Sequence, residues 1–274
     1  MRGNETAFWP ESWMDPSFQR TTKPRRTGLS MVIDKGLGLH AFQDLLQLSS
    51  PYVDVYKLGF GTSALYPLDV LRAKISLARE YGIEIMPGGT FCEVACKQTS
   101  FDTYLERTLV LGYNAIEISD GTFPFSREER DRMISMAAEA GLTVYAEFGK
   151  KAEGFTAELD ELVGTLEADL QAGASYTIVE ARESGNVGIF NQCGEVDDAF
   201  LREVVHACGV KRDKLIWEAP QKNQQLALLR TLGYNVNLGN IATTDILSVE
   251  ALRRGLRGDT AFEVIAERSK NSCG

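Results

Sequence analysis

The sequence predicts a single (β/α)₈ barrel, and three observations support this fold class. The length of 274 residues suits one barrel domain, which typically has about 250 residues. From Leu29 onward, a short apolar run, a polar or glycine-rich loop and an amphipathic helical pattern recur eight times. Five helical patterns end in a glycine just before the next apolar run, which is typical of parallel βαβ units. We therefore expect a barrel over residues 28–274, preceded by an arm over residues 1–27.

The strands and helices follow from this pattern in chain order. The predicted strand cores are 29–33, 52–58, 83–86, 115–119, 142–148, 176–180, 215–218 and 234–238. Between them, apolar residues spaced by three and four predict helices, for example one that begins near Leu68 and one that begins near Leu159. Ser126 and Glu129 have the spacing of a capping box at the start of the helix after the fourth strand. The arm is polar, and we expect it to have no core of its own.

Composition excludes several classes of function. The net charge is −9, with 29 basic and 38 acidic residues, so we expect no nucleic-acid surface, which requires a basic face. No apolar run approaches the ~18 residues of a membrane span, so we expect no membrane association and a cytoplasmic location. Cys92 and Cys96 lack the further ligands of a zinc site, and we expect the five cysteines to be inert thiols. Trp9 and Trp13 of the arm are candidates for contact with a second copy, and we expect a homo-oligomer.

Histidine is too scarce for most histidine-based mechanisms. The chain has only His40 and His206, so we expect lysines and carboxylates to carry any proton transfer. In a barrel the active site is built from the C-terminal ends of the strands. The polar residues and glycines at or just after these predicted ends are Asp34, Lys35, Lys57, Gly88, Gly89, Glu117, Asp120, Glu147, Lys150, Lys151, Glu180, Arg182, Glu218, Asn237 and Asn240.

Clustered carboxylates among lysines indicate an anionic substrate held together with a hard cation such as Mg²⁺. We expect metal ligands among Asp34, Glu117, Glu147, Glu180 and Glu218. Any one of these could instead be an interior charge paired with a lysine, or a helix cap. Burying the whole set is costly unless cations neutralise it. Because side chains alternate along a strand, Lys151 should share the face of Glu147, whereas Lys150 should point toward the helices.

Two further features are open to two interpretations. The glycine-rich loop that contains Gly88 and Gly89 could offer backbone N–H groups to an anion, or it could simply make a tight turn. The basic segment 253–259 follows the eighth strand, near where barrels often bind phosphate. It could equally be part of a solvated final helix.

The motifs at these strand ends resemble those of the phosphosulfolactate synthase family, in order, over about residues 23–260. They are MVIDKGLG at 31–38, KLGFGTS at 57–63, PGGT at 87–90, EISDGT at 117–122, EFGKK at 147–151, EARESG at 180–185, EAPQK at 218–222, NLGNIA at 237–242 and LRRGLRGDT at 252–260.

This resemblance implies Mg²⁺-dependent addition of sulfite to phosphoenolpyruvate, giving (2R)-phospho-3-sulfolactate. We expect Lys151 to be the general acid that protonates C2 and Lys57 to be the second catalytic residue. The residues expected to bind substrate are Lys35, Gly88, Gly89, Arg182, Lys222 and Asn240. In this family the product serves coenzyme M synthesis or sulfolactate production, and the sequence does not choose between them.

Two other functions remain open. One is a Schiff-base aldolase that uses Lys57 or Lys151, which would need a lysine neutral enough to act as a nucleophile. The other is a catalytically silent relative with a role in stress protection, because members of the family in plants are associated with heat tolerance. The intact set of charged strand ends favours an enzyme over a binding protein.

Overall fold

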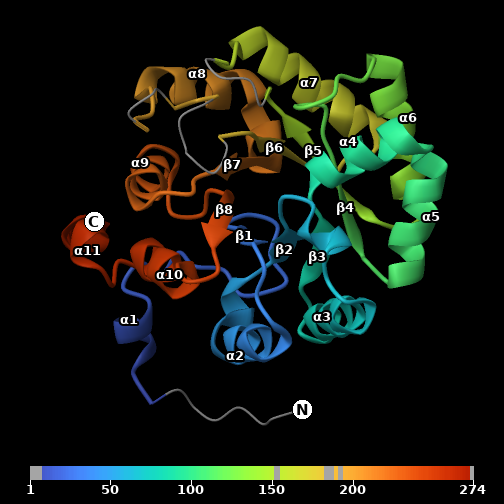
Figure 1. Cartoon of the computed structure of the whole chain (residues 1–274). Helices are drawn as coiled ribbons and strands as arrows, with labels where there is room; N and C mark the ends of the chain where they lie inside the picture. Colours follow the sequence, from blue (N-terminus) through green and yellow to red (C-terminus); the bar gives the residue numbers. More distant parts are fainter. Residues whose placement is uncertain (1–7, 151–154, 182–187, 191–193, 272–274) are drawn as a thin grey trace.

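The computed structural model describes residues 8–150, 155–181, 188–190 and 194–271. Eight parallel strands form one sheet in the order β3-β2-β1-β8-β7-β6-β5-β4, and the sheet curves into a barrel surrounded by helices (Figure 1). The predicted fold class is therefore confirmed. The strands are β1 (Ser30–Asp34), β2 (Val55–Leu58), β3 (Glu84–Pro87), β4 (Ala115–Ile118), β5 (Thr143–Phe148), β6 (Tyr176–Val179), β7 (Leu215–Glu218) and β8 (Leu238–Ala242).

The barrel is not closed by hydrogen bonds alone, because the described strands include no ladder between β3 and β4. Alternate N–H groups of a parallel strand face opposite neighbours, and those of Glu84 and Gly88 donate to the β2 side. On the β4 side, Ile85 N–H donates to the Asn114 side chain and Gly89 N–H to the Glu117 side chain, both at 2.8 Å. Pro87 between them has no N–H to offer. Side chains therefore fasten the seam between β3 and β4.

The helices lie outside the strands, and several begin and end as the sequence predicts. The main ones are α2 (Leu39–Ser49), α3 (Leu68–Glu80), α4 (Gly89–Gln98), α5 (Phe101–Leu111), α6 (Arg127–Glu139), α7 (Leu159–Ala172), α8 (Asp198–Cys208), α9 (Lys222–Leu232), α10 (Ile246–Arg254) and α11 (Gly258–Asn271). The capping box at Ser126 and Glu129 is present at the start of α6. Gly112 and Gly173 end α5 and α7 in the left-handed conformation, which glycine adopts without steric cost.

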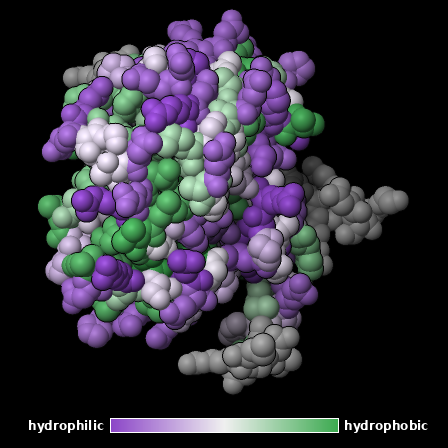
Figure 2. Space-filling view, turned by 90° about the vertical axis from the view of Figure 1, so that its right-hand side faces the viewer, coloured by the Kyte–Doolittle hydropathy of each residue, from purple (hydrophilic) through white to green (hydrophobic). Residues whose placement is uncertain are grey.

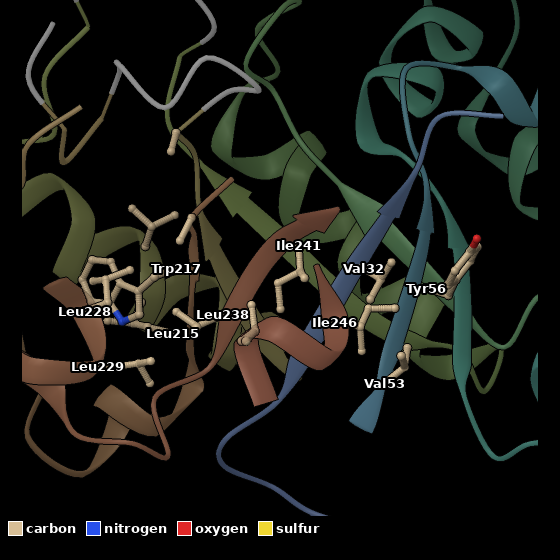
Figure 3. Packing of buried hydrophobic residues seen from close by; sticks show 14 of the residues in the cluster. Val32, Val53, Tyr56, Leu215, Trp217, Leu228, Leu229, Leu238, Ile241 and Ile246 are labelled. Carbon is tan, nitrogen blue, oxygen red and sulfur yellow. The ribbon is translucent and has the colours of Figure 1, made fainter. Parts of the chain in front are cut away.

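Strand alternation separates the barrel interior from the layer between strands and helices. Met31 and Val55 pack inside the barrel, with Met86, Tyr145 and Ile178. Val32 and Tyr56, their neighbours in sequence, pack outward against the helices. Figure 3 shows this outer layer, with Trp217, Leu238 and Ile241 between the strands and α9 and α10. The same alternation decides which charged residues at the strand ends face inward.

The eighth strand was predicted four residues too early. The apolar residues around Tyr234 precede β8, which instead runs through Leu238–Ala242. The pairing with β1 shifts from Ser30↔Leu238 to Val32↔Ile241, so β8 has one extra residue at this point, as in a β-bulge. Asn240 lies in this bulge with φ of 53°. A strand that contains a glycine and a left-handed asparagine resembles a loop in sequence, which explains the error.

The arm packs against the N-terminal end of the barrel. Its short helix α1 (Glu11–Met14) lies near α10 (Figure 1), and Arg254 donates to Met14 O. Arg20 forms a buried ion pair with Glu250 of α10 at 2.9 Å, and Arg25 pairs with Asp54, just before β2, at 2.9 Å. The arm therefore depends on the barrel for its own order.

The surface agrees with the acidic, polar composition. Hydrophilic residues cover most of the face in Figure 2, with hydrophobic residues in smaller areas among them. None of the helices in the described part of the chain is both long and apolar enough to cross a membrane.

Candidate active site

A buried lysine lies at the centre of the candidate site. Lys57 of β2 points into the barrel, with its side chain only 6% exposed. Its Nζ lies 3.0 Å from Glu117 Oε2 of β4 and 3.1 Å from Glu218 Oε1 of β7. Glu147 Oε2 of β5 is farther away, at 3.9 Å. The barrel thus brings together four charged residues that are far apart in sequence.

Glutamates dominate the electrostatics of this centre. Burial alone would lower the pKa of Lys57. The negative charges of Glu117, Glu218, Glu147 and Glu180 outweigh this effect and raise the pKa of Lys57 well above its ordinary value. The surrounding glutamates therefore favour the ammonium form of Lys57. Burying several carboxylates together is costly unless cations neutralise them, and Lys57 supplies one such cation.

Two of the four glutamates already have both carboxylate oxygens engaged by the protein. Glu117 accepts from Gly89 N–H through Oε1 and faces Lys57 through Oε2. Glu218 accepts from Ala181 N–H at 3.1 Å through Oε2 and faces Lys57 through Oε1. These two carboxylates therefore fix Lys57 relative to the backbone after β3 and β6. Glu147, at 3.9 Å, is held less tightly by Lys57.

Asp34, predicted as a metal ligand, does not join this cluster. Its carboxylate is fully buried and forms an ion pair with Lys74 of α3, and it accepts from Gly36 N–H at 2.7 Å and Leu37 N–H at 2.8 Å. The reason is alternation. Asp34 is in register with Leu58, which faces the helices, whereas Ile33 is in register with Lys57. Burial would raise the pKa of Asp34, but the hydrogen bonds from Lys74, Leu37 and Gly36 outweigh it and lower that pKa.

Lys150, which follows β5 after Gly149 with φ of 129°, pairs with a carboxylate outside the Lys57 centre. Its Nζ pairs with Asp120 Oδ2 at 3.0 Å, and Arg130 of α6 contacts the same carboxylate at 3.2 Å. The side chain borders a cavity of about 200 Å³ that Phe125 and Phe155 also line. Lys151 and Arg182, the predicted general acid and a predicted anion-binding residue, lie outside the described residues.

The N–H groups of Gly88 and Gly89 are used within the protein. Gly88 N–H donates to Leu58 O at 2.9 Å and Gly89 N–H to Glu117, so neither amide is available for the predicted contact with an anion. Gly89 has a different importance. A Cβ at this position would lie 2.7 Å from Glu117 Oε1, closer than atoms can approach. Only glycine allows Glu117 to reach this amide.

Asn240 has two properties of a functional residue. Its side chain is buried, at 6% exposure, and its backbone is in the left-handed region, with φ of 53°. Among the described residues, its Oδ1 has no hydrogen-bond partner. Strained backbone and unsatisfied buried polar atoms are both uncommon in proteins and recur at binding sites. Asn237, by contrast, binds Leu29 N–H at the other end of β8 and has a structural role.

Lys222 and Arg253 of the basic segment 253–259 bind other parts of the protein. Lys222 pairs with Asp259 at 2.8 Å. Arg253 is fully buried and donates to the carbonyls of Tyr234, Val236 and Leu29, near the N-terminal ends of β8 and β1. The structure thus supports neither the phosphate site nor the solvated helix that the sequence suggested for Arg253. Lys35 is exposed, with Nζ 5.8 Å from the centre of the Phe60 ring.

The sequence analysis missed five buried charged residues on described helices. They are Lys74 of α3, Glu93 of α4, Arg130 of α6, Asp169 of α7 and Glu250 of α10. Glu93 accepts from Thr122 N–H at 2.8 Å and also binds Ser119, so it shapes the loop after β4. Lys74 could have been recognised, because it lies three residues after Leu71, on the apolar face of its helix.

A magnesium ion fits this centre in donor chemistry and charge. Mg²⁺ is usually bound by one or two carboxylates, with substrate and water oxygens as the remaining ligands. Within the described ranges, no group of three or more His, Cys, Asp or Glu side chains has the geometry of a metal site. Glu117 and Glu218 lie within 3.1 Å of Lys57 Nζ, Glu147 Oε2 lies 3.9 Å away, and Glu180 influences Lys57 through its charge. A site of two carboxylates completed by substrate is therefore consistent with this arrangement.

The fold and the site together define a (β/α)₈-barrel protein with a buried lysine–glutamate centre at the C-terminal ends of its strands. Among solved structures, the YdjI aldolase from Escherichia coli K12 has the same fold, with a TM-score of 0.53, 14% identity and coverage of 88% of this chain and 90% of the other.

Sequence comparison assigns the family. The family model of (2R)-phospho-3-sulfolactate synthase matches residues 18–259. Phosphosulfolactate synthase from Methanothermobacter thermautotrophicus is 41% identical, covering 89% of this chain and 95% of the relative. The protein of the same name from Methanocaldococcus jannaschii is 43% identical, covering 86% and 95%. The chain belongs to the phosphosulfolactate synthase family.

Proposed function

We propose that this protein catalyses Mg²⁺-dependent addition of sulfite to phosphoenolpyruvate, giving (2R)-phospho-3-sulfolactate. The observation that carries the proposal is the Lys57 ammonium fixed among four buried glutamates at the strand ends. Family membership supplies the identity of the two substrates. The site supplies a positive charge held among carboxylate oxygens, which are the ligands that Mg²⁺ prefers.

In the proposed reaction, the sulfur lone pair of sulfite forms a bond to C3 of phosphoenolpyruvate. The C2–C3 π electrons move toward C2 and the substrate carboxylate, and a proton is then added at C2. Bound Mg²⁺ would stabilise the negative charge that develops on that carboxylate. Glu147 and Glu180 are the proposed protein ligands. Glu117 and Glu218 hold Lys57 in place, so that its charge faces the reacting centre without reorganisation.

The proton at C2 would come from Lys151, which follows Lys150 at the end of β5. The choice of Lys151 rests on the alternation expected if the strand stays extended beyond Glu147, and on the pairing of Lys150 with Asp120. Arg182, Lys35 and Asn240 are the proposed contacts for the phosphate and sulfite oxygens. Holding two anions together against their repulsion is worth up to about 7–11 kcal/mol in favourable cases.

The electrostatics of Lys57 argue against the Schiff-base alternative at this residue. A Schiff base forms only from a neutral amine, which requires a lowered pKa. The surrounding glutamates raise the pKa of Lys57 instead, so this lysine has no lone pair with which to attack a carbonyl. The silent-relative alternative predicts no turnover at all.

The test is incubation of the purified chain with phosphoenolpyruvate, sulfite and Mg²⁺, with the product identified by mass spectrometry and ¹³C NMR. A new C–S bond at C3 is expected, and chelation with excess EDTA should abolish its formation. Glu147→Gln should raise the Mg²⁺ concentration needed for half-maximal rate, whereas Asp120→Asn, at the Lys150 pair, should not. Absence of product with intact, folded protein would favour the silent relative. Full activity after exhaustive chelation would remove the metal from the mechanism.

A further inference from the structure

A second buried lysine–carboxylate pair lies beside the site, outside the barrel interior. Lys74 and Asp34 are ion-paired, and the side chains of both are 0% exposed. The rings of Phe42, Tyr56 and Tyr66 surround the ammonium, with centroids 5.1, 5.9 and 4.5 Å from Nζ. A buried pair of this kind is rarely more stabilising than apolar residues of similar volume, so its presence calls for another explanation.

The Lys74–Asp34 pair binds the backbone of the loop between β1 and α2. Asp34 accepts from Gly36 N–H and Leu37 N–H, and Lys74 donates to Leu37 O at 2.8 Å. The two side chains therefore bind both a donor and an acceptor of the same turn. Lys35 is the exposed residue directly between Asp34 and Gly36, so its backbone position is set by these contacts.

The adjoining loop after β2 is fastened to the same point. Gly59 N–H donates to Asp34 O at 3.0 Å. Phe60, the next residue, is 55% exposed and has φ of 54°, which is uncommon for a bulky residue. Its ring lies beneath the Lys35 ammonium. Both loops follow the C-terminal ends of strands, where barrel enzymes bind substrate.

We propose that Lys74 is a positioning residue that acts through Asp34 to hold Lys35 and Phe60 at the mouth of the site, where Lys35 binds an anionic group of the substrate. This inference rests on the proposed function. In this proposal Asp34 supports a loop and is not a metal ligand. Lys74, which is buried and contacts neither substrate nor the Lys57 centre, acts through Asp34. Phe60 restricts the rotamers of Lys35, which reduces the entropy lost on binding.

The test is a double-mutant cycle between Lys74 and Lys35. Lys35→Ala should weaken phosphoenolpyruvate binding by about 10–100-fold, the loss of one charge-assisted contact. Lys74→Met should weaken it to a similar degree, while kcat at saturation changes by less than about threefold. In the Lys35→Ala background, Lys74→Met should add little, because the group that it positions is already gone. Binding is measured by calorimetry, which does not require turnover.

Loss of fold is controlled by a second variant and a second readout. Asp34→Asn/Lys74→Met leaves no unpaired buried charge, so it should fold and still bind phosphoenolpyruvate weakly. In both Lys74 variants, hydrogen exchange at the Gly36 and Leu37 amides should be at least about tenfold faster than in the wild type. Arg20→Met, which breaks a similarly buried ion pair at the opposite end of the barrel, should leave phosphoenolpyruvate affinity unchanged.

Each outcome has a distinct meaning. Unchanged exchange at Gly36 and Leu37 in Lys74→Met, or additive losses of affinity in the cycle, would overturn the positioning role. A higher Mg²⁺ concentration for half-maximal rate in Asp34→Asn would indicate that Asp34 is a metal ligand. A wild type that binds phosphoenolpyruvate but forms no product would contradict the proposed function alone, and the cycle would still decide the role of Lys74.

Discussion

The position of one residue in a strand decides whether its charge reaches the centre of this barrel. Lys57, Glu117, Glu147 and Glu218 each follow an interior apolar residue by two positions, and all four face inward. Asp34 lies two positions after Val32, which faces the helices. The Asp34 carboxylate therefore faces the helices as well. A shift of one residue therefore separates a carboxylate of the site from one that supports a loop.

At this scale the first prediction concerns two adjacent lysines. Lys151→Ala should lower kcat by about 10²–10⁴-fold, the usual contribution of a positioned general acid. Lys150→Ala should act mainly on stability or binding, because it removes the partner of Asp120. Steady-state kinetics of the two variants decide the assignment. A large loss of kcat in Lys150→Ala with near-normal turnover in Lys151→Ala would reverse it.

A second prediction concerns Gly89. In Gly89→Ala the new methyl group would meet Glu117 Oε1 at 2.7 Å, so Glu117 must move away from both Gly89 N–H and Lys57. We expect kcat to fall by more than about tenfold while the barrel remains folded. Gly164→Ala on α7 is the matched control, since nothing lies within 4 Å of a Cβ there. Normal kinetics in Gly89→Ala would show that the Glu117 contact is dispensable.

The interior glutamates could be predicted from sequence because alternation is reliable within a strand whose limits are well marked. The helix residues Glu93 and Arg130 could not be predicted, because their partners lie on other elements and no local pattern records the pairing. Asp34 was misplaced because its position at a strand end was considered without its position in the alternation.

At the scale of the element, β8 shows why a strand can be hidden in a sequence. Strand patterns depend on apolar alternation, but β8 contains Gly239 and Asn240 in the middle of its five residues. A Cβ at Gly239 would lie 2.7 Å from the end of the Met31 side chain and 3.2 Å from Ile216, so a larger residue would require these side chains to shift. The apolar run before it, which was predicted to be the strand, instead packs around the buried Arg253 at the N-terminal end of the barrel.

The bulge in β8 leads to a third prediction. Asn240→Gly should keep or raise the free energy of unfolding, because glycine adopts positive φ without strain, yet it should weaken substrate binding by removing the buried amide. Asn240→Ala should lower stability by about 1 kcal/mol, since alanine tolerates this conformation less well than asparagine. Denaturant unfolding and KM, measured on both variants, separate the two effects. Unchanged KM in Asn240→Gly would exclude Asn240 from the site.

For the whole molecule, attachment of the arm should depend on pH. Burial would raise the pKa of Glu250, but Arg20 and Arg254 outweigh it and hold that pKa below its ordinary value of 4.5. The stability gained from the pair is therefore present above about pH 5 and is lost as the pH falls through the lowered pKa. Glu250→Gln should cost about 3–5 kcal/mol near neutral pH.

The measurement is denaturant unfolding of wild type and Glu250→Gln between pH 7 and pH 3. The difference in free energy of unfolding should shrink as the pH falls below the ordinary carboxyl value of 4.5 and through the lowered pKa of Glu250 in the folded protein. A constant difference across this range would mean that the ion pair is not what stabilises the arm.

The seam between β3 and β4 gives the barrel one edge that can separate without breaking any strand pairing. Among the described residues, the hydrogen bonds from β3 and the residue just after Gly88 to the β4 side are those of Ile85 with Asn114 and of Gly89 with Glu117. The amides of Ile85 and Gly89 should therefore have lower protection factors than those of β1 or β7, and Asn114→Ala should lower them further. Because Glu117 is also a partner of Lys57, such a fluctuation would remove one negative charge from the centre of the barrel. Opening of the β3–β4 seam and the pKa of Lys57 are therefore linked through the Glu117 carboxylate.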